Sequence, residues 1–401
     1  MRALVNPTEK AWELRKQKVR RGNDDISLLC VNFAGTLQEV DIRKRTDMPI
    51  DKATGTYPYR FKIDNKILDT AERAKIGLTP FDFSSEAVIM KELAKKHNFD
   101  TTYVAFRLAG EKNLLKLPDY DRPLIFQSKG CNLHDWTETG GCTYCYVDAV
   151  SNSPTLENSV WLTVRNILDT AEELKYNPAI RDNRELHRIR HSGGETTTEL
   201  DFTLELLYGI EKRGLETILV QFDTNLSTGK FIDEMMAKNE YQRDLLQQIA
   251  SFGNKIFVYG AFKGTTDENI MFNTQAKLTV DDQIYSFGKL VDAGLDVYPC
   301  IYNPDWNALP NFLDKLDENF NNASTRLRIE GLKWEYGPAQ CRLKEMAKQE
   351  NVDFKKMLNK YKLLEEENYN KSEEIMRERL DAINLTYKEF DRTRHKISKF
   401  D

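Results

Sequence analysis

The sequence of 401 residues has no long hydrophobic run and no start typical of an exported protein. No stretch approaches the roughly 18 consecutive apolar residues that a membrane-spanning helix needs. The first residues, MRALVNPTEKAW, carry charges early and lack the apolar segment of a signal peptide. We therefore expect a soluble protein of the cytoplasm that has no membrane partner.

Cysteine is also scarce, with 6 residues in the whole chain. That number is too small for the disulfide framework of a secreted protein, and a reducing compartment is the better expectation. Three of the six nevertheless lie close together, at Cys131, Cys142 and Cys145. In cytosolic proteins such crowding is typical of metal ligands. The remaining cysteines lie in no CxxC pair, so we expect one metal centre only.

The chain also has no excess of positive charge. Lys+Arg 58 against Asp+Glu 63 gives a formal net charge of -5, which provides no overall field for nucleic acid. One basic cluster near the start is made of Arg15, Lys16, Lys18, Arg20 and Arg21. Such clusters are common on solvated helix faces, which is the interpretation we prefer. A nucleic-acid partner is thus disfavoured, although the cluster leaves it open.

From Pro123 onward, short runs rich in β-branched and aromatic residues alternate with longer amphipathic segments, as in repeated βα units. The expected strands lie near Leu124–Gln127, Leu186–His191, Thr217–Phe222, Lys255–Phe262, Asp296–Ile301 and Arg326–Leu332. The expected helices are Leu156–Lys175, Glu199–Arg213, Gly229–Ser251, Val280–Ala293 and Pro304–Asn321. Six strands with five helices between them predict an α/β fold, in the form of a partial (β/α)6 TIM-like barrel over residues 121–335.

The two ends of the chain do not follow this alternation. Residues 1–120 are expected to form an N-terminal accessory region, with a helix over Ser85–His97. Residues 336–401 are strongly charged and predict a helical C-terminal extension. Its apolar stripe is made of Phe354, Met357, Leu358, Tyr361 and Leu364. Such a stripe favours packing on the same chain over a partner-binding arm.

The segment after the first expected strand reads GCNLHDWTETGGCTYCYVD. Its three thiolates could hold three irons of a [4Fe-4S] cluster and leave the fourth iron open for a ligand. Zinc is the alternative, because Cys131 and His134 form CxxH while Cys142 and Cys145 form CxxC, which together make four tetrahedral ligands. The loop alone does not decide between iron and zinc.

The second expected strand ends in HSGGETTTE, at a strand-to-helix turn. A cysteine loop after strand one, with Tyr144 directly before its last cysteine, followed one βα unit later by SGGE, resembles the radical S-adenosylmethionine superfamily. This resemblance implies that the three cysteines hold a [4Fe-4S] cluster and that Ser192, Gly193, Gly194 and Glu195 approach the amine end of S-adenosylmethionine. Tyr144 is expected beside the same cofactor.

Two further elements follow the family's order. Strand three ends in QFDTNLSTG, in which Thr224 and Asn225 resemble the family's TNG motif, although Leu226 replaces its glycine and puts a ribose contact in doubt. Strand four ends in YGAFKGTT, in which Lys263 resembles a polar residue that meets the cofactor's carboxylate in some members. Most members have CxxxCxxC, whereas ten residues here separate the first two cysteines.

The resemblance covers about residues 123–332 and implies reductive cleavage of S-adenosylmethionine to a 5′-deoxyadenosyl radical, which abstracts hydrogen from a substrate. It also implies oxygen sensitivity and an electron donor such as flavodoxin or ferredoxin. The absence of a cysteine-rich C-terminal domain and the acidic charge favour a small-molecule or nucleobase-like substrate over a peptide, protein or RNA. A non-catalytic zinc-binding interaction module is the alternative of another class. No catalytic residue is assigned.

Overall fold

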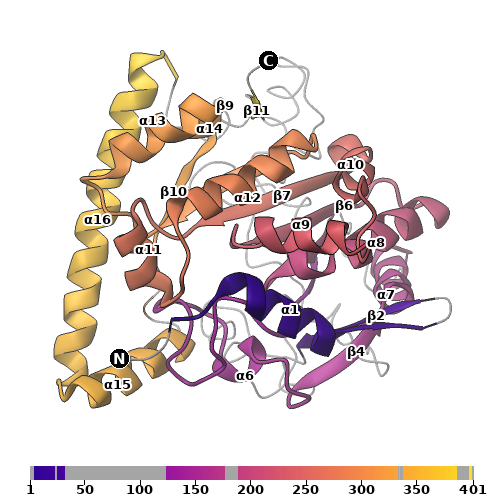
Figure 1. Ribbon diagram of the computed structural model, residues 1–401, viewed down its shortest axis with the longest axis horizontal. Helices are drawn as coiled ribbons and strands as arrows, with labels where there is room; N and C mark the ends of the chain where they lie inside the picture. Colours follow the sequence, from indigo (N-terminus) through magenta and orange to yellow (C-terminus); the bar gives the residue numbers. More distant parts are fainter. Residues whose placement is uncertain are drawn as a thin grey trace.

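Six strands form one parallel sheet at the centre of the computed structural model (Figure 1). The structure describes residues 4–22, 25–31, 123–176, 188–332, 334, 337–385 and 397–399. Along the sheet the order is β10 (Arg328–Glu330), β8 (Val297–Tyr302), β7 (Ile256–Phe262), β6 (Leu219–Thr224), β5 (Arg188–His191) and β3 (Pro123–Phe126). Every neighbouring pair is parallel. All six expected strands are confirmed, each with its ends displaced by no more than two residues.

The order of the strands in the sheet is also their order in the chain, so each connection carries the chain to the neighbouring strand. Parallel neighbours need such crossovers, which here contain helices. Within the described residues the two edge strands, β3 and β10, do not pair with each other, and the sheet is open. The predicted α/β class is confirmed.

The helices between the strands follow the predicted pattern in part. They are α6 (Ala149–Asn152), α7 (Val164–Tyr176), α8 (Leu200–Lys212), α9 (Gly229–Ala237), α10 (Leu245–Ala250), α11 (Asp267–Thr274), α12 (Val280–Asp292), α13 (Leu309–Asn319) and α14 (Ala323–Arg326). The short 3-10 helices η1 (Thr196–Glu199) and η2 (Gly253–Lys255) precede α8 and β7. The expected long helix over Gly229–Ser251 is two helices, because Asn239 adopts a left-handed φ of 58° between them. The expected helix over Pro304–Asn321 begins only at Leu309.

The predicted helix over Leu156–Lys175 is wrong in its first part. Residues Ser159–Thr163 form strand β4, and the helix begins only at Val164. The sequence SVWLT is rich in residues that favour strands, and β4 pairs antiparallel with β2 (Ile26–Val31). With β1 (Val19–Arg21) these make a second, three-stranded sheet. The partner strand is more than a hundred residues away, so local sequence could not reveal it.

The N-terminal region is described only in part. Helix α1 (Pro7–Lys18) precedes β1 and β2, with Asn6 capping it by accepting hydrogen bonds from the backbone N–H groups of Thr8 and Glu9. The helix expected over Ser85–His97 lies outside the described residues. In the expected basic cluster, Lys18 is fully buried and Arg15 nearly so, which corrects the interpretation as a solvated face for these two residues. The other three, Lys16, Arg20 and Arg21, are exposed as expected.

Two C-terminal helices, α15 (Gly337–Glu350) and α16 (Phe354–Ala382), pack on the rest of the chain. Of the expected apolar stripe, Met357 and Tyr361 are buried and Phe354, Leu358 and Leu364 are half-buried. Met376 and Leu380, further along α16, are buried as well. Arg379 of α16 forms ion pairs with Asp314 and Asp317 of α13. Figure 1 shows α16 as the long yellow helix beside α13, and the short strand β11 (Ser398–Lys399) pairs with β9 (Phe320–Asn321).

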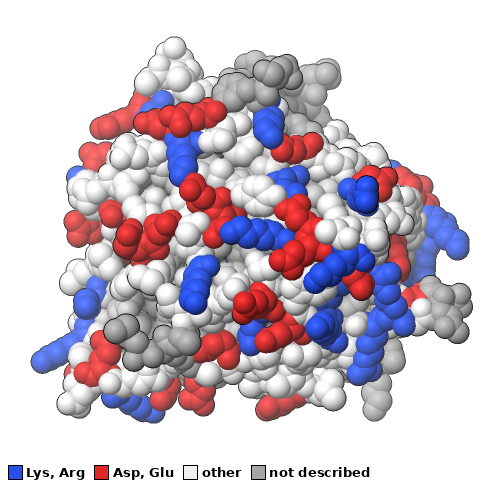
Figure 2. Space-filling model, viewed as in Figure 1, with Lys and Arg blue, Asp and Glu red and all other residues white. Residues whose placement is uncertain are grey.

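Helices cover one face of the parallel sheet, whereas the other face carries polar side chains together with a small apolar cluster of Leu219, Phe257 and Tyr298. The apolar face contains Ile189, Phe222, Val258 and Phe262, all fully buried. In Figure 1, α9 and α12 lie in front of the strands. On the face of the molecule shown in Figure 2, positive and negative side chains are interspersed. No helix among the described residues is both long and apolar enough to cross a membrane.

Candidate functional site

One cavity, of about 290 Å³, collects most of the residues expected to bind a cluster and its cofactor. The expected residues that line it are Cys131, Cys142, Tyr144, Cys145, Gly193, Gly194, Asn225 and Lys263. They come from the loop after β3 and from the turns after β5, β6 and β7. Because the strands are parallel, their carboxyl ends meet at one edge of the sheet, where α/β proteins place their sites. Ser192 and Glu195 do not line the cavity.

The loop after β3 brings its three cysteines to this cavity through tight turns. The backbone N–H of Cys145 donates to the carbonyl of Cys142 at 3.0 Å, which closes the CxxC turn. Gly130 and Gly141 have φ values of 85° and 75°, which favour glycine just before Cys131 and Cys142. The ten residues between the first two cysteines therefore do not prevent the three thiols from sharing one cavity.

Amide groups approach two of the three sulfur atoms. The Asn225 Nδ2 lies 3.7 Å from the Cys131 Sγ, and the Asn152 Nδ2 lies 3.7 Å from the Cys145 Sγ. N–H donors of this kind stabilise negative charge on sulfur, and they tune sulfur-ligated metal groups. The donor set therefore fits a group held by thiolates.

Burial and charge act in opposite directions at this site. Burial raises the pKa of the Cys131 thiol to about 12, with Cys142 adding to the effect. Burial also raises the pKa of Cys142, against which the cationic side chain of Lys263 acts. Burial lowers the pKa of Lys263, but the nearby cysteines, Cys142 first, raise it above its ordinary value. Lys263 thus provides a positive charge for thiolates that a metal group would hold in the deprotonated form.

The GGE turn after β5 is built for a close approach of backbone to backbone. Gly193 and Gly194 have φ values of 77° and 63°. A Cβ atom on Gly194 would lie 2.3 Å from the carbonyl oxygen of Gly130, and one on Gly193 would lie 2.2 Å from the Gln127 side chain. Both glycines are therefore required by their packing on the start of the cysteine loop, and they expose backbone to the cavity.

Glu195 has a different environment from the one expected for a cofactor contact. Its carboxylate is fully buried and accepts hydrogen bonds from the Asn225 backbone N–H at 2.8 Å and the Thr224 hydroxyl at 2.7 Å. It also accepts from the backbone N–H and hydroxyl of Thr197. Glu195 thus ties the turn after β5 to the turn after β6.

The turn after β6 keeps the conformation of a glycine although Leu226 occupies the position. Leu226 has a φ of 58° and is fully buried. This left-handed conformation costs a residue with a Cβ atom roughly 1–2 kcal/mol. The turn places Asn225 at the cavity, where its Nδ2 also donates to the Asn132 Oδ1 at 2.9 Å. Leu226 therefore adopts at this turn a left-handed conformation that glycine adopts readily.

Aromatic rings complete the wall around Lys263. The rings of Tyr144 and Tyr302 stack with their centroids 5.5 Å apart and an interplanar angle of 18°. The Lys263 Nζ lies 5.0 Å from the centroid of the Tyr302 ring, a cation–π arrangement. Both tyrosines line the cavity, so a bound ligand would meet one cation and two aromatic faces.

Charged residues inside the strands line the same cavity, and sequence reasoning missed them. The Arg190 guanidinium pairs with the Asp223 carboxylate at 2.6 Å. The Tyr259 hydroxyl donates to Glu330, which also pairs with Arg328 at 2.6 Å. Strands of a parallel sheet that is covered on both faces are usually apolar throughout. The charged residues in RIRH, QFDT and RIE were therefore the sequence signal that these strands line a polar cavity.

A cluster of buried charged residues contacts the GGE turn outside the cavity. The Lys18 Nζ donates to the backbone carbonyl of Glu195 at 2.9 Å and pairs with Glu199 at 2.8 Å. Glu199 also lies 3.2 Å from the His191 Nε2. Burial raises the pKa of Glu199, but Lys18 and His191 outweigh it and hold this pKa at about 2. His191, which could have faced the cavity by position, instead stacks on Phe126.

The zinc arrangement is disfavoured by the position of His134. Its Nδ1 accepts a hydrogen bond from the Trp136 backbone N–H at 2.8 Å, and His134 does not line the cavity with the cysteines. Among the described residues, no group of three or more His, Cys, Asp or Glu side chains is gathered closely enough to hold a metal ion. An iron-sulfur cluster binds each thiolate through a different iron, so its ligands stand further apart than those of one ion.

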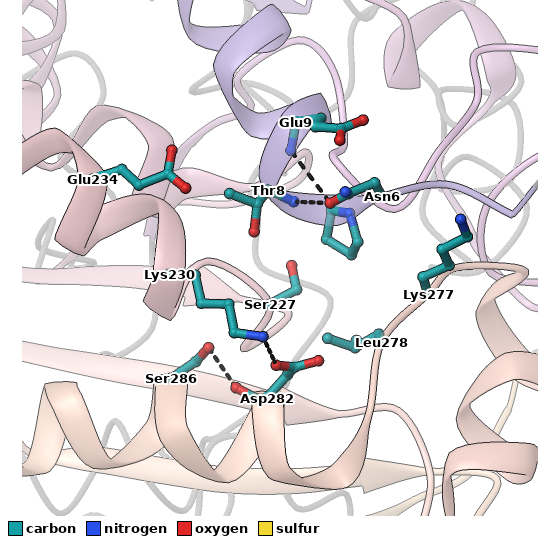
Figure 3. Close-up of a pocket in the computed structure, with 11 residues that line it drawn as sticks. Asn6, Thr8, Glu9, Ser227, Lys230, Glu234, Lys277, Leu278, Asp282 and Ser286 are labelled. Atoms are coloured by element: carbon teal, nitrogen blue, oxygen red, sulfur yellow. Dashed lines mark hydrogen bonds and ion pairs between the residues drawn. The ribbon is translucent and has the colours of Figure 1, made fainter.

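A second cavity, of about 360 Å³, lies between the starts of α1 and α9 and helix α12 (Figure 3). Figure 3 shows Lys230 paired with Asp282, at 2.7 Å, while Lys277 and Glu234 lie at its sides. Its charges are of both signs, and it contains none of the residues expected at the cluster site. It adjoins that site at Ser227, whose hydroxyl donates to Asn225.

Comparison with known proteins gave a distant structural similarity. No protein-family model matches the sequence, and no curated protein matches it. Among solved structures, the chain is similar to the cobalamin-dependent S-adenosylmethionine radical enzyme OxsB with aqua-cobalamin bound. The two share 14% identity with a TM-score of 0.33, over 69% of this chain and 38% of that chain. This chain therefore spans well under half of the length of that enzyme.

Proposed function

We propose that this protein is a radical S-adenosylmethionine enzyme whose Cys131, Cys142 and Cys145 hold a [4Fe-4S] cluster. The observation that carries the proposal is that one cavity contains the three cysteines together with the glycine turn, Asn225 and Lys263. These residues are separated by more than a hundred positions in the chain. The residues on which the sequence resemblance is based are therefore also close together in space.

The chemistry that the cluster and S-adenosylmethionine supply together is one-electron cleavage of the sulfonium bond to a 5′-deoxyadenosyl radical, which abstracts hydrogen from a substrate. The chain's own residues bind and orient. In this proposal, the backbone at Gly193 and Gly194 takes the amine end of the cofactor, and the Lys263 ammonium takes its carboxylate. Asn225 donates to the Cys131 sulfur, and the stacked Tyr144 keeps water from the thiolates.

We further propose that the open sheet curves as a partial (β/α)6 barrel, with the cavity at its mouth. The support is the strand order, which follows the chain from β3 to β10, and the polar face that lines the cavity. A core-forming barrel would fill this face with apolar side chains. Arg190, Asp223, Tyr259 and Glu330 instead make the part that lines the cavity polar, with its charges paired.

This polar lining supports a small-molecule or nucleobase-like substrate. A ligand that presents both hydrogen-bond donors and acceptors would match a surface with guanidinium, carboxylate and phenol groups. Peptide, protein or RNA modification is the second proposal for the reaction. It ranks second because the chain's own C-terminal helices add no further cysteine pair that would hold another cluster. An electron donor such as flavodoxin or ferredoxin, and a reducing, oxygen-poor cytoplasm, belong to the same proposal.

Anaerobic reconstitution with iron and sulfide tests the proposal. The wild type should bind about four irons per chain and show the visible absorption of sulfur-to-iron charge transfer. With S-adenosylmethionine and a reductant it should release 5′-deoxyadenosine. Cys142→Ser should lose both the cluster and this release, whereas Cys341→Ser should keep them, because Cys341 is exposed and lies apart from the cavity.

The zinc-binding interaction module remains the competing function. It requires His134, so His134→Ala should abolish metal binding under that hypothesis and leave iron binding unchanged under ours. A colourless protein with one zinc per chain after anaerobic purification would overturn the enzyme proposal.

A further inference from the structure

The cysteine loop is held by a residue of the C-terminal extension, which follows the barrel-like region in the chain. Arg342 of α15 is 2% exposed. Its guanidinium donates hydrogen bonds to three backbone carbonyls, those of Gly140 at 3.2 Å, Cys145 at 2.6 Å and Val147 at 2.7 Å. All three acceptors belong to the cysteine loop and its exit, and one of them is a cluster ligand of the proposed function.

The acceptors lie on both sides of the CxxC turn. Gly140 is two residues before Cys142, and Val147 is two residues after Cys145. A guanidinium is planar and presents its N–H groups in a fixed fork, so it can hold several carbonyls in one arrangement. Lysine could not reproduce this, because its single ammonium donates from one point. The geometry therefore fixes the two ends of the CxxC turn relative to each other.

Among the described residues, Arg342 donates to backbone carbonyls and forms no ion pair with a carboxylate. Burying a cation is costly, and three carbonyls recover only part of its hydration. A group of negative charge nearby would recover more. Thiolates held by a metal group would provide such negative charge.

We propose that Arg342 is a positioning residue for the cluster, through which the C-terminal extension becomes part of the cluster site. This inference rests on the proposed function. It assigns to Arg342 two effects: holding the Cys142 and Cys145 backbone in the arrangement that binds the cluster, and stabilising the cluster's negative charge. Loss of such supporting contacts around metal ligands commonly weakens metal binding about 10- to 100-fold.

The test compares Arg342→Ala and Arg342→Lys with Lys348→Ala, which removes the same charge from an exposed position of the same helix. After anaerobic reconstitution, we expect Arg342→Ala to lose iron to a chelator about 10-fold faster than wild type, or more. Its midpoint potential should be lower, because a positive charge near the cluster is gone. The midpoint potential of Arg342→Lys should lie between those of Arg342→Ala and wild type, and this variant should lose iron faster than wild type. Lys348→Ala should match wild type in both measurements.

A second measurement uses the protein without iron. Hydrogen exchange of the amides in residues 140–147 should be faster in both Arg342 variants than in Lys348→Ala, while the β6 and β7 amides stay protected. If Arg342→Ala folds poorly, the exchange measured in Arg342→Lys still tests the proposal, because this variant keeps the charge. Wild-type iron retention, potential and exchange in both variants would overturn the proposal. A wild type that binds no cluster would instead overturn the proposed function.

Discussion

The buried carboxylate of Glu195 accepts a hydrogen bond of 2.8 Å from the backbone N–H of Asn225. These two residues belong to the turns that follow neighbouring strands, β5 and β6, so one contact fixes two walls of the cavity. The same carboxylate accepts three further hydrogen bonds, from Thr197 and Thr224. Glu195 thus positions the site without lining it.

Gly194→Ala should destabilise the fold far more than Gly214→Ala. Both glycines have a left-handed φ, 63° and 67°, so both variants bear a conformational cost of roughly 1–2 kcal/mol. A Cβ atom at Gly214 meets nothing within 4 Å, whereas one at Gly194 lies 2.3 Å from the Gly130 carbonyl oxygen. We expect a loss of about 3 kcal/mol or more for Gly194→Ala. Urea denaturation measures both, and equal losses would show that the Gly194 contact does not constrain the turn.

Lys263→Met should weaken binding of S-adenosylmethionine to the reconstituted protein about 10-fold or more, because a charged hydrogen bond contributes roughly 1.5–3 kcal/mol. Lys277→Met is the matched control, since Lys277 is exposed and lines the second cavity. Isothermal titration of the two variants gives the comparison. The same dissociation constant in both variants and wild type would remove Lys263 from the cofactor site.

The Glu199 ion pair should make stability depend on pH at the acid end. In the unfolded chain this carboxyl titrates near about 4.3, and in the fold its pKa is about 2. A lowered folded pKa gives stability that is present above the unfolded value and is lost as the pH falls toward the folded one. The free energy of unfolding should therefore decline between about pH 4.3 and pH 2.

Glu199→Gln should be less stable at neutral pH, because it leaves Lys18 buried without its partner, and its decline with acid should be shallower. Glu216→Gln, at an exposed carboxyl, should keep the wild-type profile. Urea denaturation from pH 6 down to pH 2.5 follows all three proteins. Parallel profiles in wild type and Glu199→Gln would show that this ion pair is not the source of the acid sensitivity.

Asn225→Ala should make the proposed cluster harder to reduce. The Asn225 amide lies 3.7 Å from the Cys131 sulfur, and hydrogen bonds to sulfur raise the potential of such clusters. We expect a decrease on the order of tens of millivolts, measured by a redox titration of the visible absorption. Asn319→Ala, at an exposed helix end, is the control. An unchanged potential in Asn225→Ala would mean that this amide does not reach the cluster ligand.

The sequence by itself determined the six parallel strands and the segments that hold the candidate site. These depend on local patterns: β-branched runs between amphipathic segments, glycines at tight turns, and three cysteines in one loop. Such patterns are fixed by the nearest residues, so they can be read without the fold. The missed strand β4 shows the limit, because SVWLT became a strand only when β2, far away in the chain, provided its partner.

Only the tertiary structure decided what each site residue does. It placed Glu195 among hydroxyl and N–H donors behind the cavity, left His134 outside it, and brought Arg342 from the C-terminal extension to the cysteine loop. In the folded chain, Arg190 and Glu330 also line the cavity. Residue type limits the contacts that a side chain can make. Which contacts form depends on the groups that long-range packing brings within hydrogen-bonding distance.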